Sequence, residues 1–156
     1  AALGERGFQV VWSGGPGEER AVREIDPESR HPSYAGRLDL AQMWRLLKGA
    51  SLLVCPDTGI AHMGRIAGVP TVTFLGPGSA SLHRACDFWR DSPWRAATVP
   101  DFPCRDRRVL FKREIPWVRR CDRGPGECAA PRCMHAIELD PVRVQIEQLL
   151  SMREPA

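Results

Sequence analysis

The sequence has no hydrophobic run that approaches the length of a membrane span, no signal-peptide pattern at its start and no internal repeat. The first absence excludes a membrane-spanning helix, and the last excludes a fold built from repeated units. Lysine is scarce, since Lys48 and Lys112 are the only two and arginine supplies the other twenty cations. The chain begins with Ala1 rather than Met, so we expect a piece cut from a longer protein.

The bulk composition is that of an ordinary soluble globular protein. The 156 residues fit one domain with a sizeable core, with 43% hydrophobic and 26% charged residues. The net charge of +3 is modest, but the segment Arg105–Arg123 holds eight basic residues against three acidic ones, a local charge of +5. Such a segment can meet phosphates on a membrane, an acceptor or nucleic acid, and it also fits a solvated loop.

The first part of the chain predicts a strand and two helices. Residues 8–12 form an apolar run that predicts a buried strand, and residues 18–25 predict a helix with carboxylates in its first turn. A second helix is expected after Asp39 as N-cap, and Gly49 ends it. Its apolar stripe consists of Leu40, Met43, Trp44 and Leu47.

The middle of the chain alternates strand and helix at short spacing. We expect a strand at 52–55, a helix at 58–67, a strand at 71–75 and a Gly-rich turn at 76–79. This alternation predicts an α/β fold with a parallel sheet and helices on both of its faces.

The last part of the chain is less regular. One further short strand is expected at 96–99, followed by an irregular, basic, Cys-rich segment at 101–135. A closing helix is predicted at 140–153, with Pro141 at its first position. The apolar stripe of that helix consists of Val142, Ile146, Leu149 and Leu150.

The most informative motif is Asp57-Thr58-Gly59-Ile60-Ala61-His62, where the predicted strand ends and a helix begins. The first amides of a helix lack partners and its dipole is positive there, so this position binds anions. In an open α/β sheet, the carboxyl end of a strand is also where nucleotides usually bind. A nicotinamide dehydrogenase is excluded, because Ser13-Gly14-Gly15-Pro16-Gly17 does not match the Gly-x-Gly-x-x-Gly turn of that class.

These residues resemble glycosyltransferase family 9, the lipopolysaccharide heptosyltransferase family. The resemblance begins at Val10–Glu19, is most specific at Asp57–His62, and continues through Gly68–Pro77 to the closing helix. It implies the GT-B fold, in which two Rossmann-like domains enclose a cleft. Residues 1–156 are then expected to form one nucleotide-sugar donor-binding domain, the C-terminal half of such an enzyme, with a Rossmann-like three-layer α/β/α architecture.

The resemblance assigns roles to the motif. Asp57, Thr58 and Gly59 are expected at the phosphates and sugar of the donor, and His62 near the diphosphate, where it stabilises the leaving group. The general base is expected outside this chain. The alternatives are a plain N-cap pair at Asp57-Thr58 without a ligand, and an ordinary core or surface histidine at position 62.

Other positions receive weaker assignments from the same resemblance. Glu18 matches the carboxylate that binds the ribose, and Glu19 takes that role if the register shifts by one; both also fit helix-start acids. Leu38 falls where the family places an apolar residue against the base, although a core position is equally consistent. Gly76 and Ser79, in the Gly-Pro-Gly-Ser turn, are candidates near the sugar.

Four cysteines lie between positions 104 and 133, and the chain departs here from the compact Cys-rich segment of many family members. A structural zinc site, disulfides and free thiols are all open, because the spacing is not the tight pair-and-pair pattern. A reducing cytosol favours zinc or free thiols. The four candidate ligands are Cys104, Cys121, Cys128 and Cys133; Cys55 and Cys86 are expected to be ordinary buried cysteines.

The leading hypothesis is an inverting transferase that moves heptose or a similar sugar from a nucleotide-sugar to the lipopolysaccharide core or a related glycan. We expect no catalytic cofactor, an N-terminal GT-B domain of the same protein as partner, and a lipid-linked or oligosaccharide acceptor. A cytoplasmic location is expected, with a peripheral position at the inner membrane left open, and no nucleic acid. The alternatives are another GT-B enzyme such as a nucleotide-sugar epimerase, and a non-enzymatic, zinc-stabilised binding module.

Overall fold

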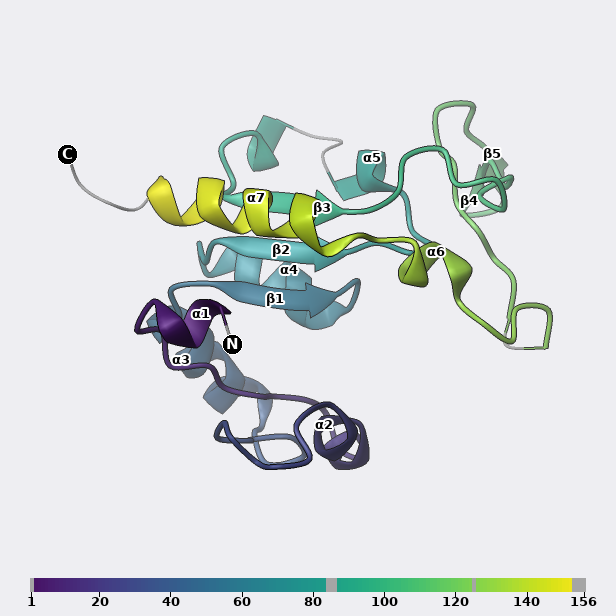
Figure 1. The fold of residues 1–156 in the computed structure, drawn as a ribbon. Helices are drawn as coiled ribbons and strands as arrows, with labels where there is room; N and C mark the ends of the chain where they lie inside the picture. The colour runs from purple at the N-terminus through teal and green to yellow at the C-terminus, as the bar shows by residue number, and fades with distance from the viewer. Residues whose placement is uncertain (1, 84–86, 125, 153–156) are drawn as a thin grey trace. The chain divides into compact units, whose positions relative to one another are not determined.

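A computed structural model describes residues 2–83, 87–124 and 126–152 of the chain (Figure 1). Internal contacts divide the chain into two compact units, Ala1–Leu46 and Leu47–Ala156. Within the described ranges, no helix combines the length and the apolar composition needed to cross a bilayer. The assignment of residues 1–156 to one donor-binding domain stays a prediction.

The first unit is mostly loop and short helix. It contains α1 (Ala2–Glu5) and α2 (Glu19–Ile25), and α3 (Leu40–Gly49) begins in it. The predicted N-cap of α3 is confirmed: Asp39 Oδ1 accepts from the Gln42 amide at 2.7 Å, and Gln42 Oε1 accepts from the Asp39 amide at 2.9 Å. This reciprocal pair satisfies two backbone donors at the start of the helix.

Two predictions for the first 50 residues are wrong in detail. The expected strand at 8–12 is reduced to a single bridge, in which the Trp12 amide donates to Pro32 and the Trp12 carbonyl accepts from Tyr34. Pro32 has no N–H, so it cannot donate to a longer ladder. On α3, Met43 and Leu47 of the predicted stripe are buried, but Leu40 and Trp44 are exposed, so the buried face is narrower than the stripe.

The second unit is built on a parallel three-stranded sheet in the order β1-β2-β3, as the alternation predicts. The strands are β1 (Leu53–Pro56), β2 (Thr71–Phe74) and β3 (Trp94–Ala97), within two residues of the predicted positions. Leu53 pairs with Thr71, and Thr71 with Trp94. All three strands therefore end at the same edge of the sheet, and the turns that follow them are brought together there.

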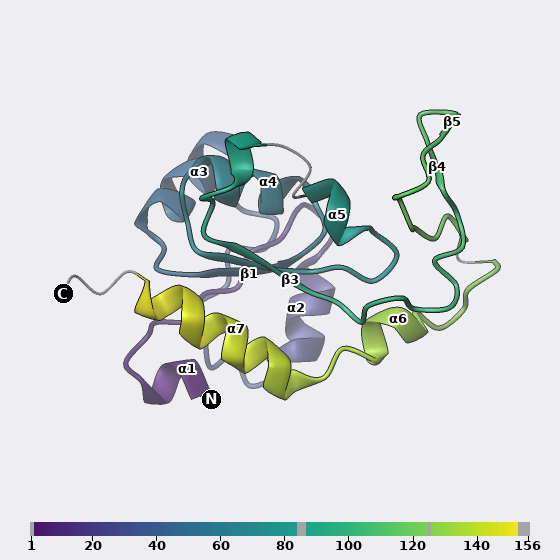
Figure 2. The same cartoon turned by 90° about the horizontal axis from the view of Figure 1, so that it is seen from above.

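Helices pack on the two faces of this sheet, as expected for a Rossmann-like fold (Figure 2). On one face, α4 (Gly59–Ile66) packs against β1 and β2; on the other, α7 (Leu139–Ser151) packs against β2 and β3. The core cluster lies under α7, which confirms the inward stripe of that helix. The buried members of the cluster are Val72, Ala97, Val142 and Leu149.

The central strand β2 is buried on both sides, and its two threonines are fully buried. Each hydroxyl has a partner: Thr71 Oγ1 donates to the Val69 carbonyl at 2.8 Å, and Thr73 Oγ1 accepts from the Trp94 indole at 2.9 Å. These bonds remove the cost of burying two hydroxyl groups in the core.

The segment after β2 contains more structure than the sequence suggests. After α5 (Ala80–His83) and the 3-10 turn η1 (Asp87–Trp89), the predicted irregular region holds a hairpin of β4 (Val109–Leu110) and β5 (Arg113–Glu114), and the short helix α6 (Arg132–His135). The last helix begins earlier than predicted, at Leu139, which places Pro141 at its third residue. Pro is tolerated there because first-turn amides have no partner within the helix.

Candidate functional site

Three predicted site residues lie in the turn from β1 into α4, at the carboxyl edge of the sheet. Asp57, Thr58 and Gly59 are exposed to solvent. Thr58 is the N-cap of α4, with an extended backbone (φ −136°, ψ 175°), but its side chain makes no capping hydrogen bond. The plain N-cap interpretation needs that bond. Its absence leaves the Thr58 hydroxyl, together with the first amides of α4, available to an anionic ligand.

The exposed His62 lies on α4 close to this turn, and the structure brings it together with Asp57. A second imidazole, that of His83 at the end of α5, completes the cluster. Ligand-type atoms of Asp57, His62 and His83 all lie within 4.8 Å of one another. The rings of His62 and His83 stack with centroids 5.3 Å apart and an interplanar angle of 7°.

His83 is the residue of this cluster that sequence reasoning missed. Its Nε2 donates to Asp57 Oδ1 at 3.2 Å, and only 8% of its side chain is exposed. Its other face stacks on Trp94 of β3, with centroids 5.3 Å apart. Position 83 belongs to no motif and has no informative spacing from residue 57, so only the folded chain reveals the contact.

The surroundings of His83 lower its pKa and so favour the neutral form of the ring. Burial is the main cause that lowers the pKa of His83, and the Asp57 carboxylate opposes it, while His62 and Arg65 lower the pKa further. Within the described residues, His83 Nδ1 is buried and has no hydrogen-bond partner. A neutral ring with its proton on Nε2 donates to Asp57 and places an unprotonated nitrogen at Nδ1.

Arg65 fixes the backbone behind this histidine. The guanidinium is buried, stacks over the rings of Trp89 and Trp94 at 4.4 and 4.8 Å, and donates to the His83 carbonyl at 2.8 Å. Arg65 belongs to α4, as His62 does, so one helix positions both the exposed imidazole and the end of α5. The His83 side chain is therefore held from two sides and has little freedom to leave Asp57.

The Gly-rich turn after β2 touches the site at one residue. A Cβ at Gly78 would lie 2.7 Å from Asp57 Oδ2, so glycine is needed for the carboxylate to lie where it does. The predicted candidates are further removed from solvent: Ser79 is buried and shares a hydrogen bond with Ser81 at 2.7 Å, and Gly76 packs against the Met134 side chain of α6.

Arg105 donates hydrogen bonds to the backbone at the carboxyl edge of the sheet, where the Gly-rich turn follows β2. It is buried, and its Nε donates to the Gly76 carbonyl at 2.7 Å. Its other nitrogens donate to the Leu75 and Val99 carbonyls and to the Thr98 hydroxyl, at 2.7 to 2.9 Å. Arg105 is one of the eight cations of the basic segment, but the structure gives it an internal role: it ties the end of β2 to the end of β3.

The donor-binding candidates Glu18 and Leu38 belong to the first unit. Glu18 is exposed and accepts from the Gly15 amide at 2.5 Å, which fits its alternative interpretation as an acid at a helix start. Glu19 is half-buried, and a Cβ at Gly36, where φ is +69°, would overlap its carboxylate. Leu38 is half-buried. The family role of Glu18 and of Leu38 stays a prediction.

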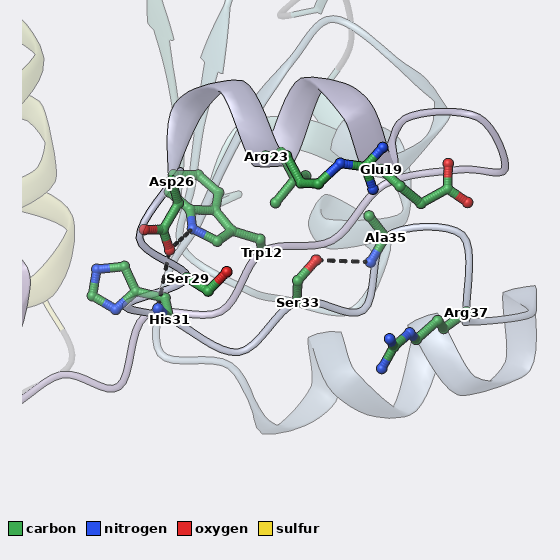
Figure 3. A pocket seen from close by; sticks show the side chains of 10 residues that line it. Trp12, Glu19, Arg23, Asp26, Ser29, His31, Ser33, Ala35 and Arg37 are labelled. Carbon is green, nitrogen blue, oxygen red and sulfur yellow. Dashed lines mark hydrogen bonds between the residues drawn. The ribbon is translucent and has the colours of Figure 1, made fainter.

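Glu19, rather than Glu18, lines a cavity in this unit (Figure 3). At one end of the cavity, the Asp26 carboxylate accepts from the Trp12 indole at 3.1 Å and from the amides of Arg30 and His31 at 3.0 Å. These bonds, that of Arg30 foremost, hold the pKa of Asp26 below its usual value. The lining also includes Arg23 and Arg37, so cations line this cavity together with the Glu19 carboxylate.

The four candidate zinc ligands do not converge on one point. In the described part of the chain, Asp57, His62 and His83 are the only set of three or more ligand-type groups within 4.8 Å, and none of the four cysteines belongs to it. The thiols of Cys104 and Cys121 share a hydrogen bond, and Cys128 donates to the Ala130 carbonyl. Cys133 is buried next to Gly76. The zinc site stays a prediction.

The remaining two cysteines differ in what the structure says of them. Cys55 on β1 is buried, as predicted, and burial raises its pKa to about 11, so it is an inert thiol. Cys86 lies outside the described residues.

Comparison with known proteins agrees with this geometry. The model of glycosyltransferase family 9 (heptosyltransferase) matches residues 1–96. A curated protein of Pseudomonas aeruginosa, lipopolysaccharide heptosyltransferase 1, is 33% identical over 125 residues, which are 72% of this chain and 35% of that protein. The Salmonella typhimurium protein of the same name is 28% identical over 82 residues, 51% of this chain and 26% of that protein.

Solved structures show the same fold. Escherichia coli ADP-heptose lipopolysaccharide heptosyltransferase II matches with a TM-score of 0.68 at 18% identity, over 99% of this chain and 40% of that one. A family 9 glycosyl transferase of Veillonella parvula matches with a TM-score of 0.50 at 23% identity, over 61% and 27% of the two chains. The chain thus spans about a third, or less, of the length of the curated proteins it matches.

Proposed function

The chain belongs to glycosyltransferase family 9, and we propose that it forms the donor-binding part of an inverting transferase that uses a nucleotide-sugar. The donor is an ADP-activated heptose or a similar sugar, and the product is an extended lipopolysaccharide core or a related glycan. The proposal combines the family with one observation: an exposed helix start whose N-cap hydroxyl is unused lies beside an ordered carboxylate and an exposed imidazole.

The diphosphate of the donor is assigned to the start of α4. Amides of the first turn and the Thr58 hydroxyl donate to its oxygens, and the positive end of the helix dipole favours its charge. His62 donates from the same helix. When the sugar leaves, negative charge grows on the diphosphate, so donors already in place stabilise the transition state.

Asp57 is assigned to the sugar. A carboxylate next to a diphosphate is repelled by it, so Asp57 is better placed to accept from sugar hydroxyls. Its bond from His83 restricts rotation of the carboxylate, and the missing Cβ of Gly78 leaves room for it. His83 is therefore a positioning residue for Asp57 in this proposal.

The roles at the nucleoside end of the donor are proposed from the family resemblance alone. Glu18 is proposed to accept from the ribose hydroxyls, with Glu19 as the alternative, and Leu38 to contact the base. Transfer needs no cofactor in this proposal, and the cysteines supply at most a structural zinc site. The remaining parts are an N-terminal GT-B domain that provides the general base and a lipid-linked or oligosaccharide acceptor, at a cytoplasmic position next to the inner membrane.

Calorimetry on the 156-residue chain tests the donor site. We expect ADP and ADP-heptose to bind, with Asp57→Ala weakening ADP-heptose about tenfold or more, as loss of a hydrogen bond to a charged group predicts, and changing ADP much less. Asp91→Ala, which removes an exposed aspartate elsewhere in the same unit, is the matched control and should bind both ligands normally. No binding by the wild-type chain, or equal loss for both variants, would overturn the assignment.

A further inference from the structure

The hairpin β4–β5 presents large apolar side chains to solvent. Phe111 at its tip is 87% exposed, Trp117 beyond β5 is 56% exposed and Val109 on β4 is 47% exposed. The hairpin extends away from the three-stranded sheet in both views of the structure (Figures 1 and 2). An aromatic group at the end of a projecting loop has no role in the core and indicates contact with another apolar phase.

The two residues at the tip of the hairpin have a strained backbone conformation. Leu110 pairs with Arg113, so Phe111 and Lys112 are the two residues of the turn. Both have a left-handed backbone, with φ of +51° and +61°. Such two-residue turns favour Asn-Gly, because bulky side chains are disfavoured at positive φ. Phe111 and Lys112 therefore cost the hairpin stability, and the turn conformation gives no reason for either side chain to be there.

The charges around the tip are mostly positive. Part of the positive charge of the segment is neutralised within the chain, by the pairs Arg107–Asp122, Arg119–Asp101 and Arg123–Asp106. Around the hairpin, four basic residues form no ion pair within the described residues, and Glu114 is the one acid among them. The four are Arg108, Lys112, Arg113 and Arg120.

We propose that this hairpin docks on an anionic lipid bilayer. The order of side chains matches the order of layers in a membrane surface: Phe111 at the tip would enter the apolar boundary, and the cations behind it would meet the anionic headgroups. Trp117 is of the type that lies at headgroup level. A nucleic acid would need a basic groove with its aromatics inside it, rather than an apolar tip in front of the cations. The bilayer gives the proposed lipid-linked acceptor a location, and for that biological role the inference rests on the proposed function.

Vesicle flotation with the 156-residue chain tests the docking. Mixed phosphatidylcholine–phosphatidylglycerol vesicles are compared with pure phosphatidylcholine vesicles at low and high salt. We expect the chain to bind the anionic vesicles, and this binding to weaken as salt is raised. Phe111→Ala/Lys112→Gln should reduce the affinity at least about tenfold, because it removes one aromatic side chain from the apolar boundary and one cation from the membrane surface.

Two further variants separate contact from folding. Phe88→Ala/Lys48→Gln removes the other exposed phenylalanine and the other lysine of the unit, and should bind like the wild type. Phe111→Asn/Lys112→Gly supplies the residues that the turn favours, so it should unfold at the same or a higher temperature and still lose vesicle binding. Equal binding of all variants, binding that does not depend on anionic lipid, or binding to an oligonucleotide in place of vesicles would overturn the proposal.

The outcome is distinguishable from that of the donor site. Failure of vesicle binding with ADP binding intact overturns the docking surface alone. Failure of ADP binding with vesicle binding intact overturns the donor site alone.

Discussion

The buried imidazole of His83 holds the exposed carboxylate of Asp57, with Nε2 3.2 Å from Oδ1. One residue comes from the turn after β1 and the other from the end of α5, beyond β2. Because His83 is itself enclosed by Trp94 on one side and His62 on the other, the bond fixes Asp57 in one orientation. This contact makes the helix start a shaped site rather than only a positive helix end.

Removing the His83 donor should weaken binding of the sugar more than that of ADP. His83→Leu keeps an apolar side chain between His62 and Trp94 but removes the hydrogen bond to Asp57. We therefore expect ADP-heptose to bind about tenfold more weakly, at the lower end of the range for a hydrogen bond to a charged group. His83→Gln can place an amide N–H close to the former Nε2, and should restore most of the affinity. Calorimetry with both ligands measures the difference; equal affinities for Leu and Gln would contradict a positioning role.

Acid should destabilise the fold, and His83 should determine the pH at which the decline in stability begins. The pKa of His83 is lowered in the folded chain, so the unfolded chain takes up its proton first as pH falls below about 6.5. Stability is then highest above that pH and declines below it. Asp26 and Asp106, whose pKa values are also lowered, lose their contribution only below the usual aspartate range, at clearly lower pH. Urea unfolding at several pH values measures the free energy of unfolding. In the wild type it should decline below about pH 6.5, and in His83→Gln this decline should be smaller.

Gly59→Ala distinguishes a helix start that binds a ligand from one that is only a helix cap. Nothing lies within 4 Å of a Cβ added at Gly59, so the substitution should leave the thermal unfolding temperature unchanged or raise it slightly. If the diphosphate approaches this backbone, the methyl group should weaken ADP binding about tenfold or more. A variant that binds ADP like the wild type would place the diphosphate elsewhere. Gly78→Ala is the contrasting variant, since its Cβ would displace the Asp57 carboxylate.

Arg105 should be a stability residue despite its place in a basic segment. Arg105→Met removes the guanidinium donor of the Gly76 and Val99 carbonyls, while the Leu75 carbonyl keeps its bond from the Thr98 hydroxyl. We expect a loss of about 3 kcal/mol in the free energy of unfolding, typical of breaking one side of a buried charged contact. Arg108→Met, at an exposed position, should change stability by less than about 0.5 kcal/mol. Denaturant unfolding compares the two.

Local sequence signals predicted the elements whose pattern is complete within a few residues. The alternation from residue 52 to 75 gave β1, α4 and β2 to within two residues, and the stripe of Val142, Leu149 and Leu150 gave the buried face of α7. The strand expected at 8–12 failed because an apolar run does not reveal whether a partner strand is present. The hairpin at Phe111-Lys112 was missed because its turn lacks the usual Asn-Gly pair.

The sequence by itself determined the parallel α/β class, the family and the position of Asp57, Thr58, Gly59 and His62 at a helix start, since each follows from the order of neighbouring residues. Only the tertiary structure decided that His83 holds Asp57, that Arg105 is an internal tie rather than a surface cation, and that a strained aromatic turn projects from the basic segment. The first two facts depend on contacts between segments distant in the chain, because parallel strands bring their carboxyl ends to one edge whatever lies between them. The third concerns a local hairpin, whose Phe-Lys turn carries no turn signal in the sequence.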